Sequence, residues 1–487
     1  MVANTNATAP RPALDVVIMA AGKGTRMKSK LPKVLHQIAG RALLQHVVDT
    51  AAELNARRVV VITGHGAMAV EAACTSFASR ARRGGAADTK GLDLRFVRQE
   101  PQLGTGHAVQ QAVPALPDDG VVVVLSGDVP LTQPDTLERL VAVCAGQHLA
   151  LLTLELPDPT GYGRIVRGPG TGPNGGPVQA IVEQKDASDA QRQIREIYSG
   201  IMAVPAALLK KWLARLTNNN AANEYYLTDI VGFAAADGVP VMAHKITDAV
   251  QVAGVNSPVQ LAELERADQL RQAKALMDQG VRLADPARFD VRGDLTCGAD
   301  VSIDVNCIFE GVVSLGDDVQ VGANCVIANA TIAAGAVIHP FTHIDGEKLG
   351  VQVGAGALIG PFARLRPGAV LGEDVHIGNF VEVKNSTLAK GAKANHLAYL
   401  GDAEVGERVN YGAGSITANY DGAFKHKTVI EADVHVGSNC VLVAPVRLGR
   451  GGTVAAGSII TKNTEPESLN VARGRQAAIP GWKRPQK

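Results

Sequence analysis

The sequence predicts an α/β chain in two parts, a Rossmann-like sheet with helices followed by a parallel β-helix of hexapeptide repeats. Two patterns predict this order. Short apolar runs alternate with helical patterns through residues 14–256, as in open α/β sheets. Aliphatic residues then recur at steps of six from Ile303 to Ile460, a period of neither a helix nor an ordinary strand. A content of only 4% aromatic residues also suits the narrow interior of a β-helix.

Length and charge limit the possible functions. A chain of 487 residues should form more than one domain. With 48 basic and 47 acidic residues, nothing points to a nucleic-acid or membrane-surface partner. Apolar runs stay well below the ~20 residues of a membrane span, so we expect no membrane partner. Residues 1–13 are polar and lack a signal-peptide core, which predicts a disordered tail.

The strand after this tail runs into a Gly-rich loop. Residues 14–21 read as a short buried strand, followed by Gly22 and Gly24 and then by the cations Lys23, Arg26 and Lys33. A strand that feeds such a loop brings backbone N–H groups and cations close to phosphates, although an ordinary βα turn has the same look.

The alternation continues as a parallel sheet would require. Strands are expected at residues 58–62, 92–98 and 121–125, and helices at 42–55, 67–77 and 108–113. The Gly-Thr-Gly at 104–106 predicts a close backbone approach at a helix start. Residues 121–125 read as a central parallel strand that ends at Ser126, Gly127 and Asp128. Asp128 lies where such sheets bind ligands and suits Mg²⁺ beside phosphates, unless it only caps the next helix.

The end of the first part contains loops and a linker. Residues 80–91 read as a solvated insertion, and residues 168–177 as the turn of a hairpin that starts at Gly161. Ser257, Pro258 and Gln260 form a capping box that opens a linker helix over residues 257–282. We expect Gly280 to end this helix. Its apolar stripe consists of Leu261, Leu264, Ala267, Leu270 and Ala273.

The hexad array predicts a β-helix over residues 283–465, followed by a basic tail over 466–487. Gly often follows an anchor, and we expect these glycines to form tight corners with positive φ. The array breaks near residues 420–428, which predicts a projecting loop. The anchors are Ile303, Phe309, Leu315, Val321, Ile327, Ile332, Ile338, Ile344, Val353, Ile359, Leu365, Leu371, Ile377, Val383, Ile430, Val436, Leu442, Leu448, Val454 and Ile460, with Ala394, Tyr411 and Thr417 as departures from the aliphatic pattern.

Three cysteines, Cys307, Cys325 and Cys440, each lie four residues after an anchor. This regularity favours small residues packed inside the coil over a metal cluster. Free buried thiols suit a reducing cytoplasm, where we expect the protein.

One histidine stands out from the rest of the array. His396 lies off the anchor positions, and His is the side chain best able to take a proton near neutral pH. The other histidines of the array read as ordinary surface residues: His339, His343, His376, His426 and His435. Without such polar residues, a β-helix would be equally consistent with a plain oligomerisation or regulatory scaffold.

The loop sequence from Met19 to Met27, followed by Pro32 and Lys33, resembles the sugar nucleotidyltransferase signature. With the linker helix and the hexads, residues 14–485 resemble the family of bacterial bifunctional enzymes that make UDP-N-acetylglucosamine. The motifs that carry this likeness are LPKVLH, QLGTGHA, GDVPL, DPTGYGR, LTNNN, EYYLTD and DPARFD in the first part and linker, and residues 361–368, 378–384 and 394–402 in the second.

The resemblance implies two activities. One is an Mg²⁺-dependent uridylyltransferase at residues 14–256 that joins UTP and N-acetylglucosamine-1-phosphate. The other is an acetyltransferase in a left-handed β-helix that joins acetyl-CoA and glucosamine-1-phosphate. It also implies a homotrimer with acetyl sites between subunits and a tail that reaches a neighbour.

The resemblance also implies the site residues. The UDP-sugar set is Met19, Ala20, Ala21, Gly22, Lys33, Gln99, Gly104, Thr105, Ser126, Gly127, Asp128, Gly163, Glu183, Tyr198 and Asn256, of which Asp128 and Asn256 bind Mg²⁺. The acetyl set is His396 as general base, Arg366, Lys384, Tyr399 and Asn410 for glucosamine-1-phosphate, and Ala413, Asn419, Tyr420, Ser438, Ala456 and Arg473 for acetyl-CoA. Ser126 and Tyr198 depart from the Tyr and Asn of the family pattern.

Two alternatives remain at this point. A single-activity sugar nucleotidyltransferase of the ADP-glucose or GDP-mannose type would use the β-helix for regulation or assembly and would not need His396 or Lys384. A catalytically dead regulatory subunit would lack Arg26, Lys33 or Asp128, and all three are present.

Overall fold

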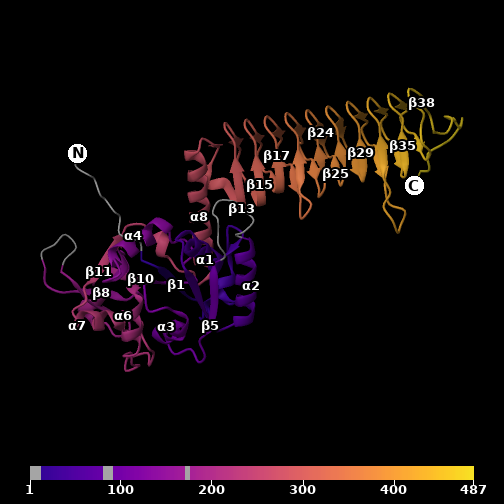
Figure 1. Ribbon diagram of the computed structural model, residues 1–487. Coiled ribbons are helices and arrows are strands. Elements are labelled where there is room, and N and C mark those ends of the chain that lie inside the picture. The colour runs from indigo at the N-terminus through magenta and orange to yellow at the C-terminus, as the bar shows by residue number, and fades with distance from the viewer. Residues whose placement is uncertain (1–11, 81–91, 171–175, 487) are drawn as a thin grey trace, which may run out of the picture. The chain divides into compact units, whose positions relative to one another are not determined.

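The computed structural model describes residues 12–80, 92–170 and 176–486, with backbone only over 76–80. The chain forms two compact units, one ending at Ala267 and the other beginning at Asp268 (Figure 1). Most of the expected tail, most of the 80–91 insertion and the middle of the 168–177 turn lie outside the described residues. In the described ranges, no helix has the length and apolar character needed to cross a bilayer.

The first unit is a nine-stranded mixed sheet with helices on both faces. Its main strand order is β11-β7-β10-β6-β1-β4-β5, and β8 and β9 form the hairpin beside β10. The strands are β1 Leu14–Met19, β4 Arg58–Thr63, β5 Asp93–Arg98, β6 Val121–Ser126, β7 Leu149–Glu155, β8 Arg164–Arg167, β9 Val178–Val182, β10 Glu196–Pro205 and β11 Val241–Ile246, with a small pair β2 Gln37–Ile38 and β3 Arg41–Ala42.

Helices α1, α2 and α4 pack on one face of this sheet, and α3, α6 and α7 on the other. The helices are α1 Leu43–Glu53, α2 Ala67–Arg80, α3 Thr105–Ala112, α4 Pro134–Cys144, α5 Asp189–Arg192, α6 Ala206–Leu213, α7 Asp229–Ala236 and α8 Pro258–Asp278, with 3-10 turns η1 Thr25–Met27, η2 Lys33–Leu35, η3 Val113–Ala115, η4 Ala249–Val252 and η5 Pro286–Arg288.

The central strand β6 differs from the prediction on one side. It pairs parallel with β1, but its other neighbour β10 is antiparallel to both β6 and β7. The chain enters β10 after the β8–β9 hairpin and so runs back across the sheet. An antiparallel pair can still be buried on both faces when helices cover them, which is why β6 reads as a continuous apolar run.

The linker helix α8 begins at Pro258, as predicted, and Gly280 with φ +99° follows its end. Leu264 packs with the first unit and Ala273 with the second, whereas Leu270 is 39% exposed, so the predicted stripe is wrong at that position. The boundary between the compact units lies inside this helix, and the functional domain limits stay a prediction.

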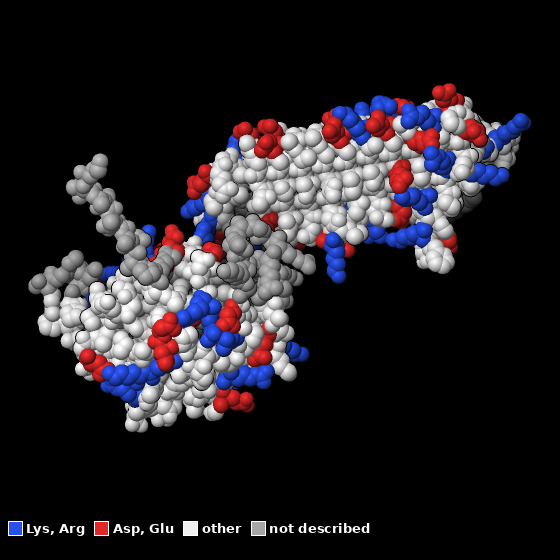
Figure 2. All heavy atoms as spheres, viewed as in Figure 1, with Lys and Arg blue, Asp and Glu red and all other residues white. Residues whose placement is uncertain are grey.

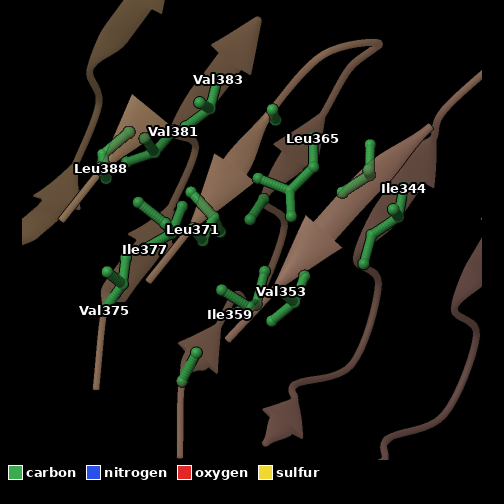
Figure 3. Packing of buried hydrophobic residues seen from close by; sticks show 14 of the residues in the cluster. Ile344, Val353, Ile359, Leu365, Leu371, Val375, Ile377, Val381, Val383 and Leu388 are labelled. Carbon is green, nitrogen blue, oxygen red and sulfur yellow. The ribbon is translucent and has the colours of Figure 1, made fainter. Parts of the chain in front are cut away.

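The second unit is a parallel β-helix. Ile303 pairs with Val321 and Ile359 with Ile377, so three hexads make one coil. Every predicted aliphatic anchor is buried, as Figure 3 shows for Ile344 to Val383, and Ala394, Tyr411 and Thr417 are buried in the same interior. The hexad prediction is therefore confirmed, because a side chain at every sixth position enters the same narrow core.

The strands form three faces. The first face is β12 Arg282–Leu283, β14 Ser302–Ile303, β16 Gln320–Val321, β18 Val337–Ile338, β21 Leu358–Ile359, β24 His376–Asn379, β27 Lys393–His396, β30 Asn410–Tyr411, β33 His435–Val436, β36 Thr453–Val454 and β38 Leu469–Asn470. The second is β19 His343–Asp345, β22 Arg364–Leu365, β25 Glu382–Lys384, β28 Tyr399–Gly401, β31 Ile416–Ala418, β34 Val441–Val443 and β37 Ile459–Ile460. The third is β20 Val351–Val353, β23 Val370–Leu371, β26 Thr387–Leu388, β29 Ala403–Val405, β32 Thr428–Ile430 and β35 Val446–Leu448. Three longer strands of the first coils run through the corner that joins the second and third faces: β13 Phe289–Cys297, β15 Cys307–Leu315 and β17 Val326–Ile332.

The reason for the glycines after the anchors differs from the prediction. Gly360 has positive φ, but Gly322, Gly372, Gly378 and Gly437 do not. A Cβ at Gly378 would collide with the Asn395 carbonyl, and one at Gly372 would lie 3.0 Å from the Lys390 nitrogen. These glycines let neighbouring coils stack closely, while left-handed corners fall three residues before an anchor, at Asp318, Asn324 and Asp374 for example.

The cysteine prediction is confirmed. Cys307, Cys325 and Cys440 are buried free thiols in the coil interior. Burial raises the pKa of Cys307 to about 11 and that of Cys325 to about 12, so both stay protonated and unreactive at neutral pH.

Candidate active sites

The Gly-rich loop leaves the carboxyl end of the central strand β1. Its backbone is held from both sides, since Ala20 N donates to Ile62 O at 2.9 Å and Gly127 N donates to Met19 O at 2.9 Å. A Cβ at Gly22 would meet nothing within 4 Å, so this position faces open space. Gly24 has φ +60° and lies so close to Lys33 that a Cβ there would be 2.6 Å from the Lys33 Cβ. Gly24 therefore folds the loop, while Gly22 leaves room for a ligand.

Two predicted metal ligands converge on one lysine. The Lys33 ammonium bonds the Asp128 carboxylate and lies 3.1 Å from Asn256 Oδ1. Asp128 follows β6, and Asn256 is placed next to it because Val255 N donates to Asp128 O at 2.9 Å. Gln260, the capping residue of α8, accepts a bond from Asn256 N at 2.8 Å. A carboxylate and an amide oxygen that share one cation fit Mg²⁺, which prefers hard oxygen ligands.

Arg26 joins this cluster through a bond from Nη2 to Asn256 Oδ1 at 2.8 Å. The sequence suggested Arg26 only as a phosphate cation, together with Lys23 and Lys33. The structure shows two of these three cations, Arg26 and Lys33, beside the predicted metal ligands, while Lys23 is exposed.

The second Gly-Thr-Gly lies against the polar loop that precedes α7. Gly106 N donates to Tyr225 O at 2.7 Å, and a Cβ at Gly104 would lie 2.6 Å from that same oxygen. The close backbone approach expected at a helix start is therefore to the chain's own segment at Tyr225, and α3 begins at Thr105 rather than at residue 108. Gln99 Nε2 donates to Gly104 O at 2.9 Å, which brings together the predicted nucleotide residues Gln99, Gly104 and Thr105.

The predicted sugar residues form a linked group. Tyr198 N donates to Gly163 O at 2.9 Å, and a Cβ at Gly163 would lie 3.6 Å from the Glu183 carboxylate. Burial raises the pKa of Glu183, and Thr228, which the sequence analysis missed, donates to its Oε1 at 3.0 Å. The Tyr198 side chain lies in the core and its hydroxyl is buried, with no hydrogen-bond partner in the described part of the chain. In this structure, only the backbone of Tyr198 takes part in the group.

One corner of the β-helix carries most of the predicted acetyl site. At this corner, between the first and second faces, the chain turns through a left-handed residue on each coil. The residues just before these turns form what we call the edge row: Asn379, His396, Ala413, Ser438 and Ala456. Coil-to-coil bonds connect them, as in Gly414 N to His396 O at 3.2 Å and Asn439 N to Ala413 O at 2.7 Å. The predicted base and three predicted acetyl-CoA residues thus lie in one line.

His396 has a partner that the sequence analysis missed. Its Nδ1 lies 3.0 Å from Asn379 Oδ1, and the two residues pair in register between β24 and β27. An amide oxygen only accepts, so Nδ1 carries the proton and Nε2 is free to act as a base. The register of the hexads, which puts the two residues at the same position of adjacent coils, was the signal that could have found Asn379.

The predicted sugar-phosphate residues divide between two faces. Arg366, Lys384 and Tyr399 lie on the second face, where Arg366 donates to Glu382 Oε1 at 2.8 Å. Asn410 lies on the first face, where its side chain is 3.5 Å from His435 Nδ1. The structure therefore does not bring all four together within one chain.

Lys384 lies beside a second cation from the projecting loop. The Lys425 ammonium, followed by burial and by Arg366, lowers the pKa of Lys384. The loop is held by pairing of Tyr420 with Lys425, and Asn419 Nδ2 donates to Asp402 Oδ2 at 2.5 Å. Lys425 was missed because only the fold of the loop places it near Lys384. Three neighbouring cations suit a phosphate.

The remaining predicted acetyl-CoA residues lie at two corners of the β-helix, Arg473 beside the edge row and Asn419 and Tyr420 where the chain passes from the second face to the third. Arg473, from the chain after the coil, donates from Nη1 to Ala456 O at 2.7 Å. Tyr420 is 62% exposed, and its hydroxyl donates to Gly422 O of the same loop at 2.6 Å.

These features define a class, a two-site transferase with a nucleotide site at a sheet edge and an acyl-transfer site on a hexapeptide coil. Family models agree: the MobA-like NTP transferase domain matches residues 16–165, the bacterial transferase hexapeptide (six repeats) matches 350–385, and the hexapeptide repeat of succinyl-transferase matches 427–462.

The chain is similar over its length to proteins named "Bifunctional protein GlmU". That of Polaromonas naphthalenivorans is 74% identical over 97% of this chain and 98% of the relative. That of Albidiferax ferrireducens is 72% identical over 97% and 100%, and that of Herminiimonas arsenicoxydans is 53% identical over 97% and 99%. The chain belongs to the bifunctional GlmU family, so it is a bifunctional transferase with nucleotidyltransferase and acetyltransferase parts, and the predicted family is confirmed.

Proposed function

We propose that the second unit acetylates glucosamine-1-phosphate from acetyl-CoA and that the first unit then joins UTP and N-acetylglucosamine-1-phosphate, for cell-wall and lipopolysaccharide precursors in the cytoplasm. The observation that carries the proposal is the separation of two polar clusters into two units, Lys33 with Asp128 and Asn256 in one, and the edge row in the other.

In acetyl transfer, the amine of the sugar attacks the thioester carbonyl, and the thiol of CoA leaves. His396 Nε2 takes the amine proton as the new C–N bond forms, because Asn379 holds the proton on Nδ1. Arg366 and Lys384 bind the sugar phosphate, while the acetyl donor lies along Ala413, Ser438 and Ala456 with its thioester end near His396.

In uridylyl transfer, an oxygen of the sugar phosphate attacks the α-phosphorus of UTP, and pyrophosphate leaves. Mg²⁺, when bound by Asp128 and Asn256, would neutralise phosphate charge. Lys33, which bonds these same oxygens here, turns to the phosphates in the loaded site, and the loop at Gly22 leaves room for them. The residues position the reactants, and no covalent intermediate is needed.

Assembly into a homotrimer would complete the acetyl site. Asn410 and the Arg366 group lie on different faces of one β-helix, so one face of a copy must meet another face of its neighbour to unite them. The same corner carries stacked apolar side chains, which we call the Phe stack: Phe341, Phe362, Phe380 and Leu397, exposed by 51%, 47%, 56% and 63%. Its rings lie 5.0 and 5.3 Å apart. Such a row beside His396 fits a surface that a second copy covers.

The charge distribution supports the same assembly. In Figure 2, the charged residues of the β-helix lie along its upper and lower edges and toward its right-hand end, and the middle of the broad side in view carries few of them. On the third face, ion pairs such as Lys427 with Glu404 mark a surface that remains in water.

The test is to supply glucosamine-1-phosphate, acetyl-CoA, UTP and Mg²⁺ and to measure free thiol and pyrophosphate separately. We expect both, with pyrophosphate dependent on the first product unless N-acetylglucosamine-1-phosphate is added. Release of pyrophosphate without any thiol would instead support the single-activity alternative.

A further inference from the structure

Gln99 is a buried amide with three polar neighbours. It follows β5 at the carboxyl edge of the sheet and is 5% exposed. Its Nε2 lies 2.9 Å from Gly104 O and 3.2 Å from His107 Nδ1, and its backbone N donates to Thr63 O at 2.8 Å.

These neighbours fix the orientation of the Gln99 amide. A carbonyl oxygen only accepts, so Gly104 O requires the NH₂ end of Gln99. The second N–H then points to His107 Nδ1, which must be unprotonated to accept it. With both N–H groups bonded inside the protein, Gln99 Oε1 is the atom left for a ligand.

The same reasoning fixes the His107 ring. Gln111 Nε2 lies 3.2 Å from His107 Nε2, but a neutral imidazole has one acceptor nitrogen and serves only one of the two amides. Gln111 is half-buried and already donates to His107 O at 3.1 Å, so water can satisfy its other N–H. Gln99 is buried, and an unpaired N–H there would cost about 1–3 kcal/mol. Nδ1 is therefore the acceptor.

We infer that His107 is a positioning residue for base selection: it holds Gln99 Oε1 as the acceptor for the N3–H of uracil. This rests on the proposed function, in which Gln99 contacts the uridine nucleotide. Cytosine has an acceptor at N3, so two acceptors would face each other and CTP would be rejected. His107 acts only through Gln99 and does not touch the base.

Two substitutions distinguish the role of His107 as a hydrogen-bond acceptor from its role in packing. His107→Asn places an amide oxygen near the position of Nδ1, and His107→Leu keeps the branched shape without an acceptor. Gln111→Ala is the matched control, since Gln111 contacts the same ring. The ratio of kcat/KM for UTP to that for CTP is measured with N-acetylglucosamine-1-phosphate and Mg²⁺, after thermal melting shows that each variant is folded.

We expect His107→Leu to lower this ratio about tenfold, the size of one hydrogen bond, mainly through the KM for UTP. His107→Asn and Gln111→Ala should keep the ratio within about twofold. An unchanged ratio in His107→Leu, or an equal fall in the Asn variant, would overturn the inference while leaving the proposed function intact. A wild-type chain that releases no pyrophosphate from UTP would overturn the proposed function and this inference with it.

Discussion

The two units hold their candidate sites in opposite ways. In the first unit, the side chains of Lys33 and Asp128 are only 14% and 20% exposed and already bonded within one chain. In the second, His396 is exposed at a corner, and the residues predicted to bind one substrate lie on two faces. An open sheet gathers strand ends at one edge, so a single chain can complete a site there. A narrow β-helix has no such edge, and we propose that a neighbouring copy completes its acetyl site.

The largest expected effect is the loss of uridylyl transfer in the first unit alone. Asp128→Ala removes the carboxylate that would hold Mg²⁺, and we expect uridylyl transfer to fall by about 10³-fold or more while acetyl transfer is unchanged. Pyrophosphate and thiol release measure the two activities. Asp189→Ala, at a carboxylate that is 99% exposed, should alter neither. Wild-type uridylyl turnover of Asp128→Ala at limiting Mg²⁺ would refute the metal assignment.

The converse change acts on the second unit. His396→Ala removes the proposed base, and we expect acetyl transfer to fall by about 10³-fold with uridylyl transfer retained. His376→Ala, on the neighbouring coil of the same face, is the control and should be nearly silent. Equal acetylation by His396→Ala and wild type would exclude His396 as the base.

Assembly should matter for one site only. Phe362→Glu puts a charge into the Phe stack, so we expect dissociation and a loss of acetyl transfer of about 10²-fold, with uridylyl transfer preserved. Analytical ultracentrifugation gives the mass. Thr387→Glu, exposed on the third face, should leave both mass and activity unchanged. A monomeric Phe362→Glu variant with full acetyl transfer would show that the site is complete in one chain.

A smaller change should sharpen the account of the edge row. Asn379→Ala frees the His396 ring, and we expect kcat for acetyl transfer to fall about tenfold. Asn379→Asp keeps an acceptor and adds a charge that favours imidazolium. The acidic limb of its pH–rate profile should therefore move to higher pH. An unchanged profile in Asn379→Asp would contradict the contact.

The smallest effect concerns alkaline pH. Lys425, burial and Arg366 lower the pKa of Lys384, so its charge should be lost below the ~10.4 of an ordinary lysine. The KM for glucosamine-1-phosphate should rise as the pH increases through the lowered pKa of Lys384. The rise should be smaller in Lys384→Arg, because arginine stays charged. A KM that is flat to pH 10 in the wild type would count against Lys384 as a phosphate ligand.

The parts of the fold set by local periodicity could be predicted from the sequence. The anchors from Ile303 to Ile460 are buried because each hexad repeats the same environment. The antiparallel β10 could not be predicted, since strand direction depends on the path of the chain through the β8–β9 hairpin. The role of Gly378 was also missed, because it depends on the Asn395 carbonyl of the next coil.

The sites show the same limit. Asp128 and Lys33 belong to sequence motifs, and the structure places them together. The core position of Tyr198 follows from the alternation of side chains along β10, which puts Tyr198 on the same face as Met202 and Val204. It was missed because no strand was predicted over residues 196–205. Lys425 reaches Lys384 only through the fold of its loop, so no spacing along the chain indicates that contact.

Mixing two single-site variants tests the central claim, that the two sites work independently, most directly. Asp128→Ala and His396→Ala are purified separately and given glucosamine-1-phosphate, acetyl-CoA, UTP and Mg²⁺, and UDP-N-acetylglucosamine is quantified. We predict almost none from either variant alone and near wild-type formation from the mixture, because the intermediate diffuses from one protein to the other. A mixture as inactive as its components would contradict the account.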